Sequence, residues 1–513
     1  MSHIRPLVPD GAPFNPAERA FINGWLAAFY GETASPAAAA PAPAADSLPW
    51  HDMSLALDTR MKLAADKPLP LRLMAAMAQQ DCGQCGYLCR SYADAIAAGT
   101  EKALTRCVPG GKETARMLKE LLETPGAAVA APAVASAAAP AKAKTEVLAR
   151  FRGAGCLNRD GSAKDTRHVV LDIYGSGLKY RTGDSLAIMP ENAPETATGI
   201  VAALGADAYD AIACPDGVTR PLLEALQKHC DIGRPSDEAV EVLASRATDP
   251  DDSQRLQALA EGYPGAEPEG ADLLELLETF RSARPPLQEL MAALGPLQPR
   301  LYSIACSPLA HGGEIHLTVS AVRWEQRGRA RKGIASCYLA ERVRPHLELP
   351  VHVQAPAHPF SLPASADAPV IMIGPGTGIA PFRAFLQERR ETGAKGRNWL
   401  FFGDQHRASD FLYEDELVRF HKDGLLTRLD LAFSRDQTER VYVQQRMREQ
   451  ASRLWAWLNE GAYLYVCGAS AMGRDVETAL VAIIARQGKM GMGAAKAWLA
   501  TLAREGRYAK DVY

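Results

Sequence analysis

The sequence predicts a multidomain α/β protein with three folded parts. These are an antiparallel β-barrel carrying a helical insertion, a doubly wound parallel-sheet domain, and a small α-rich N-terminal domain. Three observations predict this. The 513 residues are enough for three or four domains, two alanine- and proline-rich linkers divide the chain, and near Pro369 short alternating strands give way to strands and helices in turn.

The linkers set the expected domain boundaries. Thr33 to Pro49 and Pro125 to Lys144 lack the large side chains that a core needs, and their prolines interrupt helices. We therefore expect the following parts: an N-terminal helix and linker (1–49), a four-cysteine domain (50–124), a second linker (125–144), the barrel (145–367) with its insertion (about 193–294), and the parallel-sheet domain (368–513).

Strand and helix patterns support these parts. EVLARFRGAG, RHVVLDIYG and EIHLTVSAV are short strands separated by glycine turns, as in an antiparallel barrel. The insertion contains helical patterns such as RPLLEALQKHCDI, and GKETARMLKELLE predicts an amphipathic helix at the end of the four-cysteine domain. From Pro369, apolar strands such as VIMIG and NWLFFG alternate with helices, which is typical of a parallel sheet covered on both faces.

Composition excludes several classes of protein. A net charge of -3 provides no field that would attract nucleic acid or an anionic membrane. The longest uncharged stretch, 127–141, is interrupted by prolines and is shorter than the roughly 20 residues of a membrane span. Ten cysteines are too few for a disulfide scaffold, and no secretory signal is visible. We therefore expect a cytoplasmic protein that binds neither nucleic acid nor membrane.

The loop GPGTGIAPFR follows the strand VIMIG and opens a helix. Gly374, Gly376 and Gly378 would let the backbone around Thr377 approach phosphate oxygens, and the helix start supplies amide donors. The loop therefore predicts a pyrophosphate site. A tight strand-to-helix connection is the simpler alternative.

A second polar group follows the third strand of the same domain, in FSRDQTERVYVQ. Its candidate nucleotide ligands are Ser434, Arg435, Arg440, Tyr442 and Gln444. Guanidinium groups and a hydroxyl suit the 2'-phosphate of NADPH, whereas NADH sites favour a carboxylate. The pattern favours NADPH, although two solvated arginines on a polar helix start would give the same sequence.

The predicted barrel contains two further motifs. RLYS places Arg300 and Tyr302 on one face of a strand and Ser303 on the other, so that a cation lies beside an aromatic ring able to stack on a flat ligand. KGIAS precedes a helix. Each motif alone is compatible with ordinary strand or helix-cap sequence.

Together these motifs identify a resemblance. Residues from about Glu146 to Tyr513 resemble the ferredoxin-NADP reductase-like diflavin reductases, which include cytochrome reductases and sulfite reductase flavoproteins. The strings that carry it, in the family's order, are YRTGDSLAIMPEN, RLYSIACSP, GIAS, IMIGPGTGIAPFRAFLQER, LFFGDQ, FSRDQTERVYVQ, YVCGASAMGRDV and RYAKDVY.

The resemblance implies an NADPH-dependent FAD oxidoreductase. It implies that Arg300, Tyr302 and Ser303 hold the flavin and its ribityl phosphate, that Tyr513 covers the flavin, and that Ser303, Cys467 and Asp511 line the hydride-transfer site. The residues implied at the FAD pyrophosphate are Gly333, Ile334, Ala335 and Ser336.

The sequence departs from the family in two places. Ala469 and Ser470 follow Cys467 and Gly468 where the family often has a carboxylate. The FMN-binding flavodoxin domain is missing, because Met1 to Glu123 is too short and shows no strand-helix alternation, so no FMN is expected.

A cysteine cluster lies where that domain would be. Cys82, Cys85 and Cys89 are spaced to share nearly one helical face, and Cys107 can complete four thiolates, which suit either an iron-sulfur cluster or zinc. The segment resembles a small iron-sulfur domain that begins CGxCGxxC and ends CVPGG. That resemblance favours [4Fe-4S].

These features imply a relay in which NADPH reduces FAD and FAD passes single electrons to the cluster. The expected partner is a separate sulfite reductase hemoprotein, with nitrate or nitrite reductase as the alternative. A different hypothesis keeps the cysteines as a zinc-stapled docking module and leaves only diaphorase activity.

We interpret the scattered cysteines, Cys156 included, as small buried side chains, and His352 and His358 as structural or surface residues.

Overall fold

The computed structural model describes residues 48–51, 55–79, 87–101, 104–123, 146–214, 217–263, 265–356 and 360–513. The chain divides into two units, Met1–His51 and Asp52–Tyr513. The four-cysteine segment, the antiparallel sheet with its insertion and the parallel sheet all belong to the second unit. Cys82 and Cys85 lie outside the described residues.

The four-cysteine segment is helical where it is described. Its elements are α2 (Leu57–Leu63), α3 (Leu69–Ala76), α4 (Cys89–Ala97), the 3₁₀ turn η1 (Val108–Gly110) and α5 (Gly111–Glu123). The amphipathic helix predicted from GKETARMLKELLE is confirmed as α5, with Leu118 and Leu121 buried.

One expectation for this segment is wrong. Cys89 begins a helix, and Tyr87 and Leu88 before it are not helical, so no continuous helix carries the cysteines up to Cys89 on one face. The physical reason is a local helix-start signal. The Ser91 hydroxyl accepts a hydrogen bond from the Leu88 backbone N–H at 2.9 Å, which satisfies a donor that a longer helix would have used.

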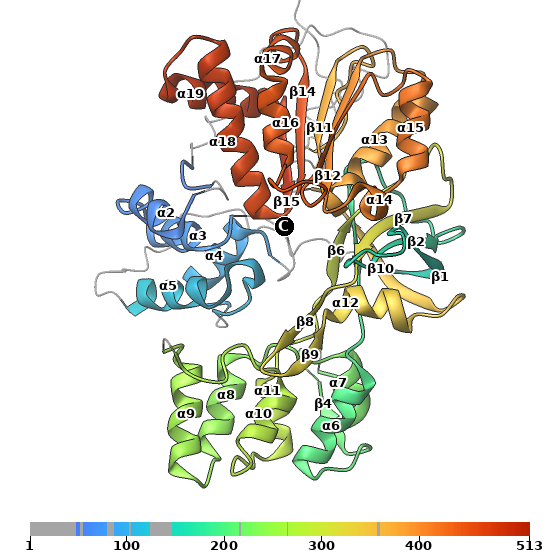
Figure 1. Cartoon of the computed structure of the whole chain (residues 1–513). Helices are drawn as coiled ribbons and strands as arrows, with labels where there is room; N and C mark the ends of the chain where they lie inside the picture. The colour runs from blue at the N-terminus through green and yellow to red at the C-terminus, as the bar shows by residue number, and fades with distance from the viewer. Residues whose placement is uncertain are drawn as a thin grey trace, which may run out of the picture. The chain divides into compact units, whose positions relative to one another are not determined.

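A six-stranded antiparallel sheet follows, in the order β6-β3-β10-β1-β2-β7 (Figure 1). Its strands are β1 (Val147–Cys156), β2 (Thr166–Asp172), β3 (Ser185–Ile188), β6 (Arg300–Ser303), β7 (Glu314–Ser320) and β10 (Glu348–Gln354). The antiparallel pairing is confirmed. The end strands approach through an isolated bridge between Ile304 and Leu317, and the closed barrel stays a prediction.

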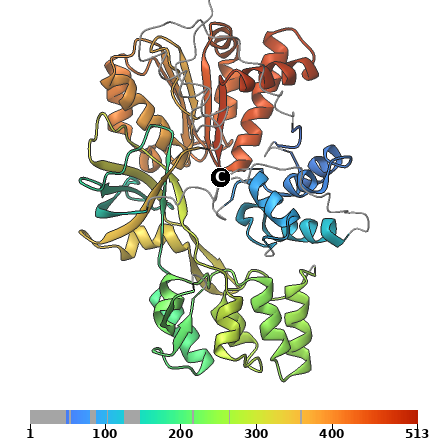
Figure 2. The same cartoon turned by 180° about the vertical axis from the view of Figure 1, so that it is seen from behind.

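Helices fill the segment between β3 and β6. They are α6 (Pro194–Leu204), α7 (Leu222–Lys228), α8 (Asp237–Ser245), α9 (Pro250–Ala260), α10 (Leu273–Thr279) and α11 (Leu287–Ala293), with a small pair β4 (Ala211–Ala213) and β5 (Thr219–Pro221). They pack on one another around their own apolar core, which includes Ile200, Leu243 and Phe280 (Figure 2).

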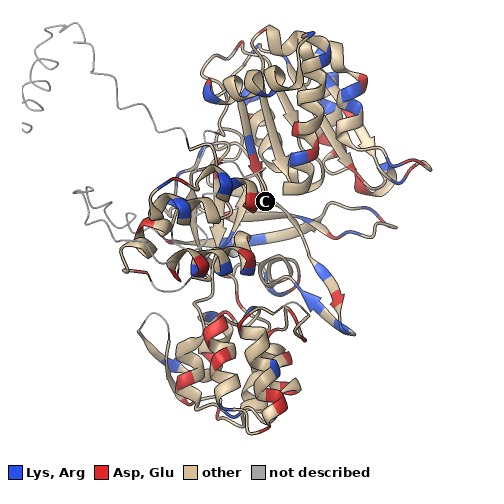
Figure 3. Ribbon diagram, turned by 90° about the vertical axis from the view of Figure 1, so that its left-hand side faces the viewer, with Lys and Arg blue, Asp and Glu red and all other residues tan. Residues whose placement is uncertain are grey.

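A hairpin that the sequence did not predict links this bundle to the sheet. It consists of β8 (Arg323–Gln326) and β9 (Arg329–Lys332) and precedes the short helix α12 (Ile334–Cys337) and the π-helical turn η2 (Tyr338–Arg342). Lys and Arg positions gather on the hairpin, and Asp and Glu positions are common on the helices of the insertion (Figure 3). Arg327 and Arg331 both bond to the buried Glu275 of α10, so opposite charges fix the insertion to the hairpin.

The last part of the chain is a five-stranded sheet in the order β13-β12-β11-β14-β15, parallel throughout as predicted. Its strands are β11 (Val370–Ile373), β12 (Asn398–Asp404), β13 (Arg428–Phe433), β14 (Tyr463–Gly468) and β15 (Tyr508–Val512). The helical elements are η3 (Gly376–Ile379), α13 (Ala380–Glu391), α14 (Arg407–Asp410), α15 (Glu414–Lys422), α16 (Val443–Glu449), α17 (Ala451–Asn459), α18 (Ser470–Gln487) and α19 (Met492–Arg504).

Both faces of this sheet are buried. Alternate residues of β11 enter two separate cores: Ile371 and Ile373 pack with α16 to α19, whereas Val370 and Met372 pack with α13 and α15 (Figure 1). This explains why the strands read as unbroken apolar runs in the sequence. The carboxyl ends of the strands form one edge, where α/β folds bind their ligands.

One further expectation is wrong. Cys156, interpreted from the sequence as a buried side chain, is exposed at the end of β1. Cys214, Cys230, Cys306 and Cys337 are buried as expected. No described helix is both long and apolar enough to cross a lipid bilayer.

Candidate functional site

The site lies where β6 of the antiparallel sheet meets β14 and β15 of the parallel sheet. Ser303, the last residue of β6, donates a hydrogen bond from Oγ to Oδ2 of Asp511 at 2.7 Å. Cys467 and Asp511 are register partners on β14 and β15, and the Cys467 Sγ lies 3.9 Å from the same carboxylate oxygen. The structure thus brings together three residues that lie up to 208 positions apart in sequence.

Burial sets the protonation of this group. It raises the pKa of the Asp511 carboxyl, although the Ser303 hydroxyl partly offsets the rise by stabilising the charged form. Burial also raises the pKa of Cys467 well above its usual range, and the neighbouring Asp511 raises it further. Cys467 is therefore a neutral thiol.

Tyr513 lies beside these residues and contacts the glycine loop. Its backbone N–H donates to Gly468 O at 3.1 Å, and its carbonyl accepts from Ser470 N–H at 3.0 Å, at the start of α18. Its phenol oxygen lies 2.8 Å from Oγ1 of Thr377. The backbone of Tyr513 is thus held on both sides, while its side chain reaches across to the loop after β11.

The three glycines of that loop are required for two different reasons. A Cβ at Gly374 would overlap the Gly378 carbonyl, and one at Gly378 would overlap the Cys467 carbonyl. Gly376 instead adopts a φ of +57°, which favours glycine. Gly374 therefore lets the loop fold closely on itself. Gly378 lets the loop pack directly against β14 at Cys467.

The predicted flavin ligands occupy the other side of the site. Tyr302 packs against the core of the antiparallel sheet, and burial raises its pKa. The Arg300 guanidinium donates to the Gln298 carbonyl at 2.8 Å. Gly333 caps α12, and a Cβ there would come within 2.5 Å of Oγ of Ser336, which accepts a hydrogen bond from Val322 N–H at 3.1 Å.

The predicted 2'-phosphate ligands lie past the end of β13. Ser434 N–H bonds to Asp404 O and Arg435 N–H to Gln405 O, both at 2.9 Å, so the turn is tied to the end of β12. Arg435 and Arg440 are exposed, and neither forms an ion pair within the described part of the chain. Tyr442 caps α16, in which Gln444 is half-buried.

An ion pair that the sequence analysis missed lies between the two phosphate-site predictions. Lys164, from the loop between β1 and β2, pairs with Asp404 at the end of β12, whose side chain is only 1% exposed. Burial raises the pKa of Asp404, and Lys164 opposes the rise. No local pattern in the sequence signals this pair, because it joins residues 240 positions apart.

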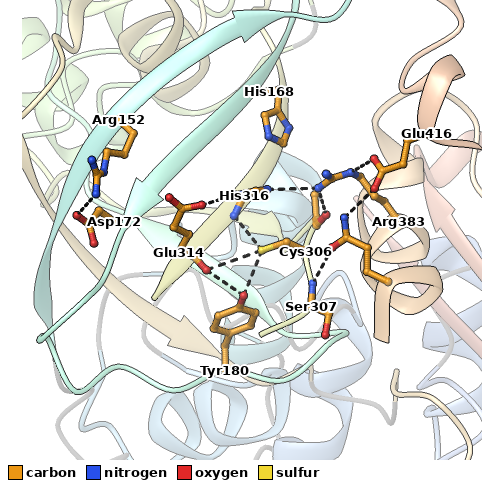
Figure 4. Close-up of polar contacts among 12 residues, drawn as sticks. Arg152, His168, Asp172, Tyr180, Cys306, Ser307, Glu314, His316, Arg383 and Glu416 are labelled. Carbon is orange, nitrogen blue, oxygen red and sulfur yellow. Dashed lines mark hydrogen bonds and ion pairs between the residues drawn. The ribbon is translucent and has the colours of Figure 1, made fainter. Parts of the chain in front are cut away.

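A second network joins the two sheets (Figure 4). Arg383 of α13 donates to the Ala305 carbonyl at 2.7 Å and to Glu416 at 2.6 Å, and contacts Nδ1 of His316 at 3.4 Å. Because an arginine can only donate, Nδ1 of His316 accepts this contact. The ring proton is then on Nε2, which donates it to the Glu314 carboxylate at 3.1 Å.

This network includes a group of metal-ligand type that the sequence analysis did not recognise. His311, Glu314 and His316 place one ligand atom each within 4.8 Å of one another. Burial, with His311 and Arg383, lowers the pKa of His316 to about 3, so the ring is neutral. Arg383 and Glu314 each contact one of its two ring nitrogens. We therefore interpret these residues as part of the contact between the two sheets.

Comparison with known protein families agrees with the division into an antiparallel-sheet part and a parallel-sheet part. Residues 139–338 match the FAD binding domain model, and residues 372–478 match the oxidoreductase NAD-binding domain model. The chain contains an FAD-binding domain and an NAD-binding domain. Ser303 and Tyr302 belong to the first, and Thr377, Arg435 and Cys467 to the second.

The chain is also similar to curated proteins. It is 43% identical over 413 residues to the sulfite reductase [NADPH] flavoprotein alpha-component of Bacillus subtilis, covering 77% of this chain and 66% of that protein. It is 44% identical over 360 residues to the protein of the same name from Photorhabdus laumondii, covering 69% of this chain and 58% of that protein. The chain thus spans about three fifths of the length of the relatives it matches.

Proposed function

We propose that the chain is an NADPH-dependent flavoprotein reductase that delivers electrons to a separate terminal reductase. One observation carries the proposal: Ser303 of the FAD-binding domain donates a hydrogen bond to Asp511 of β15, and the same carboxylate oxygen contacts Cys467 of the NAD-binding domain. A flavin and a nicotinamide bound to their own domains would meet at this point. The similar proteins are named sulfite reductase [NADPH] flavoprotein alpha-component, which supports NADPH as donor.

The residues present fit FAD. The start of α12 at Gly333, where a Cβ would crowd the Ser336 hydroxyl, suits a pyrophosphate, and the ring of Tyr302 suits a flavin. Arg300 and Ser303, together with Ile334, Ala335 and Ser336, would complete the contacts. Bound FAD would accept two electrons together from NADPH and release them singly.

The protein's own residues position the nicotinamide and exclude water. Asp511 fixes the Ser303 hydroxyl, and the Cys467 side chain beside Asp511 is neutral and fully buried. Tyr513 would cover the flavin until the nicotinamide displaces it. Arg435 and Arg440 would bind the 2'-phosphate, with Ser434, Tyr442 and Gln444 beside them, and so select NADPH over NADH.

The test compares Ser303→Ala with Ser245→Ala, an exposed serine on α8. Loss of the Ser303 hydroxyl should lower kcat for ferricyanide reduction by up to about 100-fold through misorientation, with little change in the KM for NADPH. Ser245→Ala should behave like the wild type. Equal kinetics for the two variants would remove Ser303 from the reaction.

The four-cysteine domain is proposed to hold a [4Fe-4S] cluster. Cys89 and Cys107 are buried in the helical segment, and the backbone N–H groups of Ala78 and Gly110 approach Cys107 and lower its pKa against the rise caused by burial. Such amide contacts suit a thiolate ligand. Cys82 and Cys85 would supply the other two thiolates, and the cluster would carry one electron at a time.

Zinc is the alternative for the same thiolates, and it would make the domain a docking module. Analysis of the purified protein for iron, acid-labile sulfide, zinc, FAD and FMN decides between them. The proposal expects iron and sulfide in equal amounts, FAD and no FMN. One zinc per chain and no sulfide would establish the docking module and leave diaphorase activity.

The proposed partner is a sulfite reductase hemoprotein, and the proposed location is cytoplasmic. The test mixes the protein with purified sulfite reductase hemoprotein or with nitrite reductase and follows NADPH oxidation that depends on sulfite or nitrite. Turnover with sulfite supports the proposal. Turnover with nitrite alone would favour the alternative acceptor.

A further inference from the structure

A carboxylate lies in the turn that carries the proposed 2'-phosphate ligands. Asp436 directly follows Arg435 in the turn after β13, and it is exposed. A carboxylate at this place would repel a 2'-phosphate, whereas the free ribose hydroxyls of NADH favour one. The turn therefore contains a group suited to each nucleotide, and the orientation of Asp436 bears on the choice between them.

The Asp436 side chain is directed towards the segment that follows β12. Its Oδ1 lies 3.1 Å from Nδ1 of His406, and its Oδ2 accepts a hydrogen bond from the Arg407 backbone N–H at 2.9 Å. Because an ionised carboxylate can only accept, Nδ1 of His406 carries the proton and donates it. Both oxygens of Asp436 thus have a partner after β12.

These contacts continue the pairing of two parallel strands. β12 and β13 are neighbours in the sheet. Beyond β13, the backbone N–H groups of Ser434 and Arg435 donate to the carbonyls of residues 404–405, both at 2.9 Å. The side-chain contact between His406 and Asp436 is the next one along the same two segments. It holds the carboxylate in line with the strand ends.

The backbone of His406 is fixed independently of its ring. Its N–H donates to Oδ2 of Asp410 at 2.9 Å. Asp410 is fully buried, and its Oδ1 accepts a hydrogen bond from the Asn158 side chain at 2.9 Å. The His406 side chain itself is 40% exposed. Replacing the ring would therefore remove a surface contact without opening a core.

We propose that His406 is a positioning residue for nucleotide choice, which keeps the negative charge of Asp436 away from the 2'-phosphate site. This inference rests on the proposed function, because it requires Arg435 and Arg440 to bind the 2'-phosphate of NADPH. Without the imidazole, Asp436 retains only the contact with the Arg407 N–H. The two nearby guanidinium groups then attract the carboxylate, which competes with the phosphate for them.

Release of one exposed carboxylate should have a moderate effect. Two unit charges about 4 Å apart in water change a binding constant about 5-fold, and salt weakens the interaction. We therefore expect His406→Ala to lower kcat/KM for NADPH by about 3- to 10-fold. The value for NADH should not fall, because NADH has no 2'-phosphate and its 2'-hydroxyl can donate to a carboxylate.

The experiment uses the full chain loaded with FAD and measures ferricyanide reduction with NADPH and with NADH at fixed low ionic strength. His406→Asn keeps an N–H donor near the position of Nδ1 and should retain most of the wild-type preference for NADPH. His346→Ala, an exposed histidine between η2 and β10, is the matched control and should keep the wild-type preference.

A second substitution tests whether His406 acts through Asp436. In a chain that carries Asp436→Asn, His406→Ala should have no further effect, because no charge is left to compete with the phosphate. Glu439→Gln removes a different exposed carboxylate of the same segment and should leave the effect of His406→Ala in place. A purely structural role of His406 would lower kcat/KM for both nucleotides and would not depend on residue 436.

The outcomes separate this inference from the function on which it rests. If the wild type reduces ferricyanide with neither nucleotide, or equally well with both, the proposed function fails and the inference fails with it. If the wild type prefers NADPH and His406→Ala keeps that preference, His406 does not hold the carboxylate away. An equal loss with both nucleotides, or the same loss of preference in the Asp436→Asn background, would overturn the inference while leaving the proposed function intact.

Discussion

Nucleotide selectivity offers a quantitative test of Arg435 and Arg440. Both guanidinium groups are exposed past the end of β13, and no carboxylate pairs with either among the residues that the structure describes. A phosphate would therefore not have to displace an existing ion pair. Arg435→Ala and Arg440→Ala should each weaken NADPH and leave NADH nearly unaffected, because only NADPH carries the 2'-phosphate.

The magnitude follows from the type of contact and its exposure. A hydrogen bond to a charged group contributes about 1.5 to 3 kcal/mol, or roughly 10- to 150-fold. Solvent screens exposed charges, so the lower end applies and each variant should lose about 10-fold in kcat/KM for NADPH. The double variant should lose about 100-fold if the two contacts act independently.

The assay is steady-state ferricyanide reduction with NADPH and with NADH at fixed ionic strength. Arg486→Ala, on the exposed side of α18, is the matched control and should keep the wild-type ratio. Arg435→Lys should recover part of the loss, since it keeps the charge. A fall of the same size with both nucleotides would refute the assignment of these arginines to the 2'-phosphate.

Three further predictions concern stability, pH and the cluster. Gly378→Ala should lower the free energy of unfolding by about 1 to 3 kcal/mol, because the new Cβ would overlap a backbone carbonyl. Gly493→Ala is the control and should not lower it, because a Cβ at that position meets open space. Chemical denaturation measures both variants. Because burial raises the pKa of Asp511, folding favours its protonated form. The stability that this provides is lost as pH rises through the folded pKa, so the Tm advantage of wild type over Asp511→Asn should shrink as pH rises, and a constant difference would argue against the shift. Cys107→Ala should abolish electron delivery to the partner while ferricyanide reduction by NADPH continues, and equal loss of both activities would contradict the proposed order of transfer.

The parts of the fold that follow local patterns could be predicted from the sequence. The helix Gly111–Glu123 has a regular apolar face, and the strands of the parallel sheet are continuous apolar runs buried on both faces. Cys89 shows the limit of spacing alone. Its separation from the earlier cysteines fits one helical face, but the hydrogen bond from Leu88 to Ser91 starts the helix at Cys89 instead.

Contacts between distant segments could not be predicted in the same way. The pairing of Lys164 with Asp404 depends on where a loop of one sheet meets the end of a strand in the other, and no local pattern records that meeting. The contact between Thr377 and Tyr513 likewise depends on β15 lying beside β14. The family resemblance named Ser303, Cys467 and Asp511, and the structure shows them together, but their roles in the reaction stay predictions.

The most direct test of the proposed function is an anaerobic titration of the purified protein with NADPH, followed by its visible spectrum. We predict that the protein contains FAD and that stoichiometric NADPH bleaches the flavin absorption, with NADH at the same concentration reacting much more slowly. A protein that binds FAD but is not reduced by NADPH, or that reacts equally with both nucleotides, would contradict it.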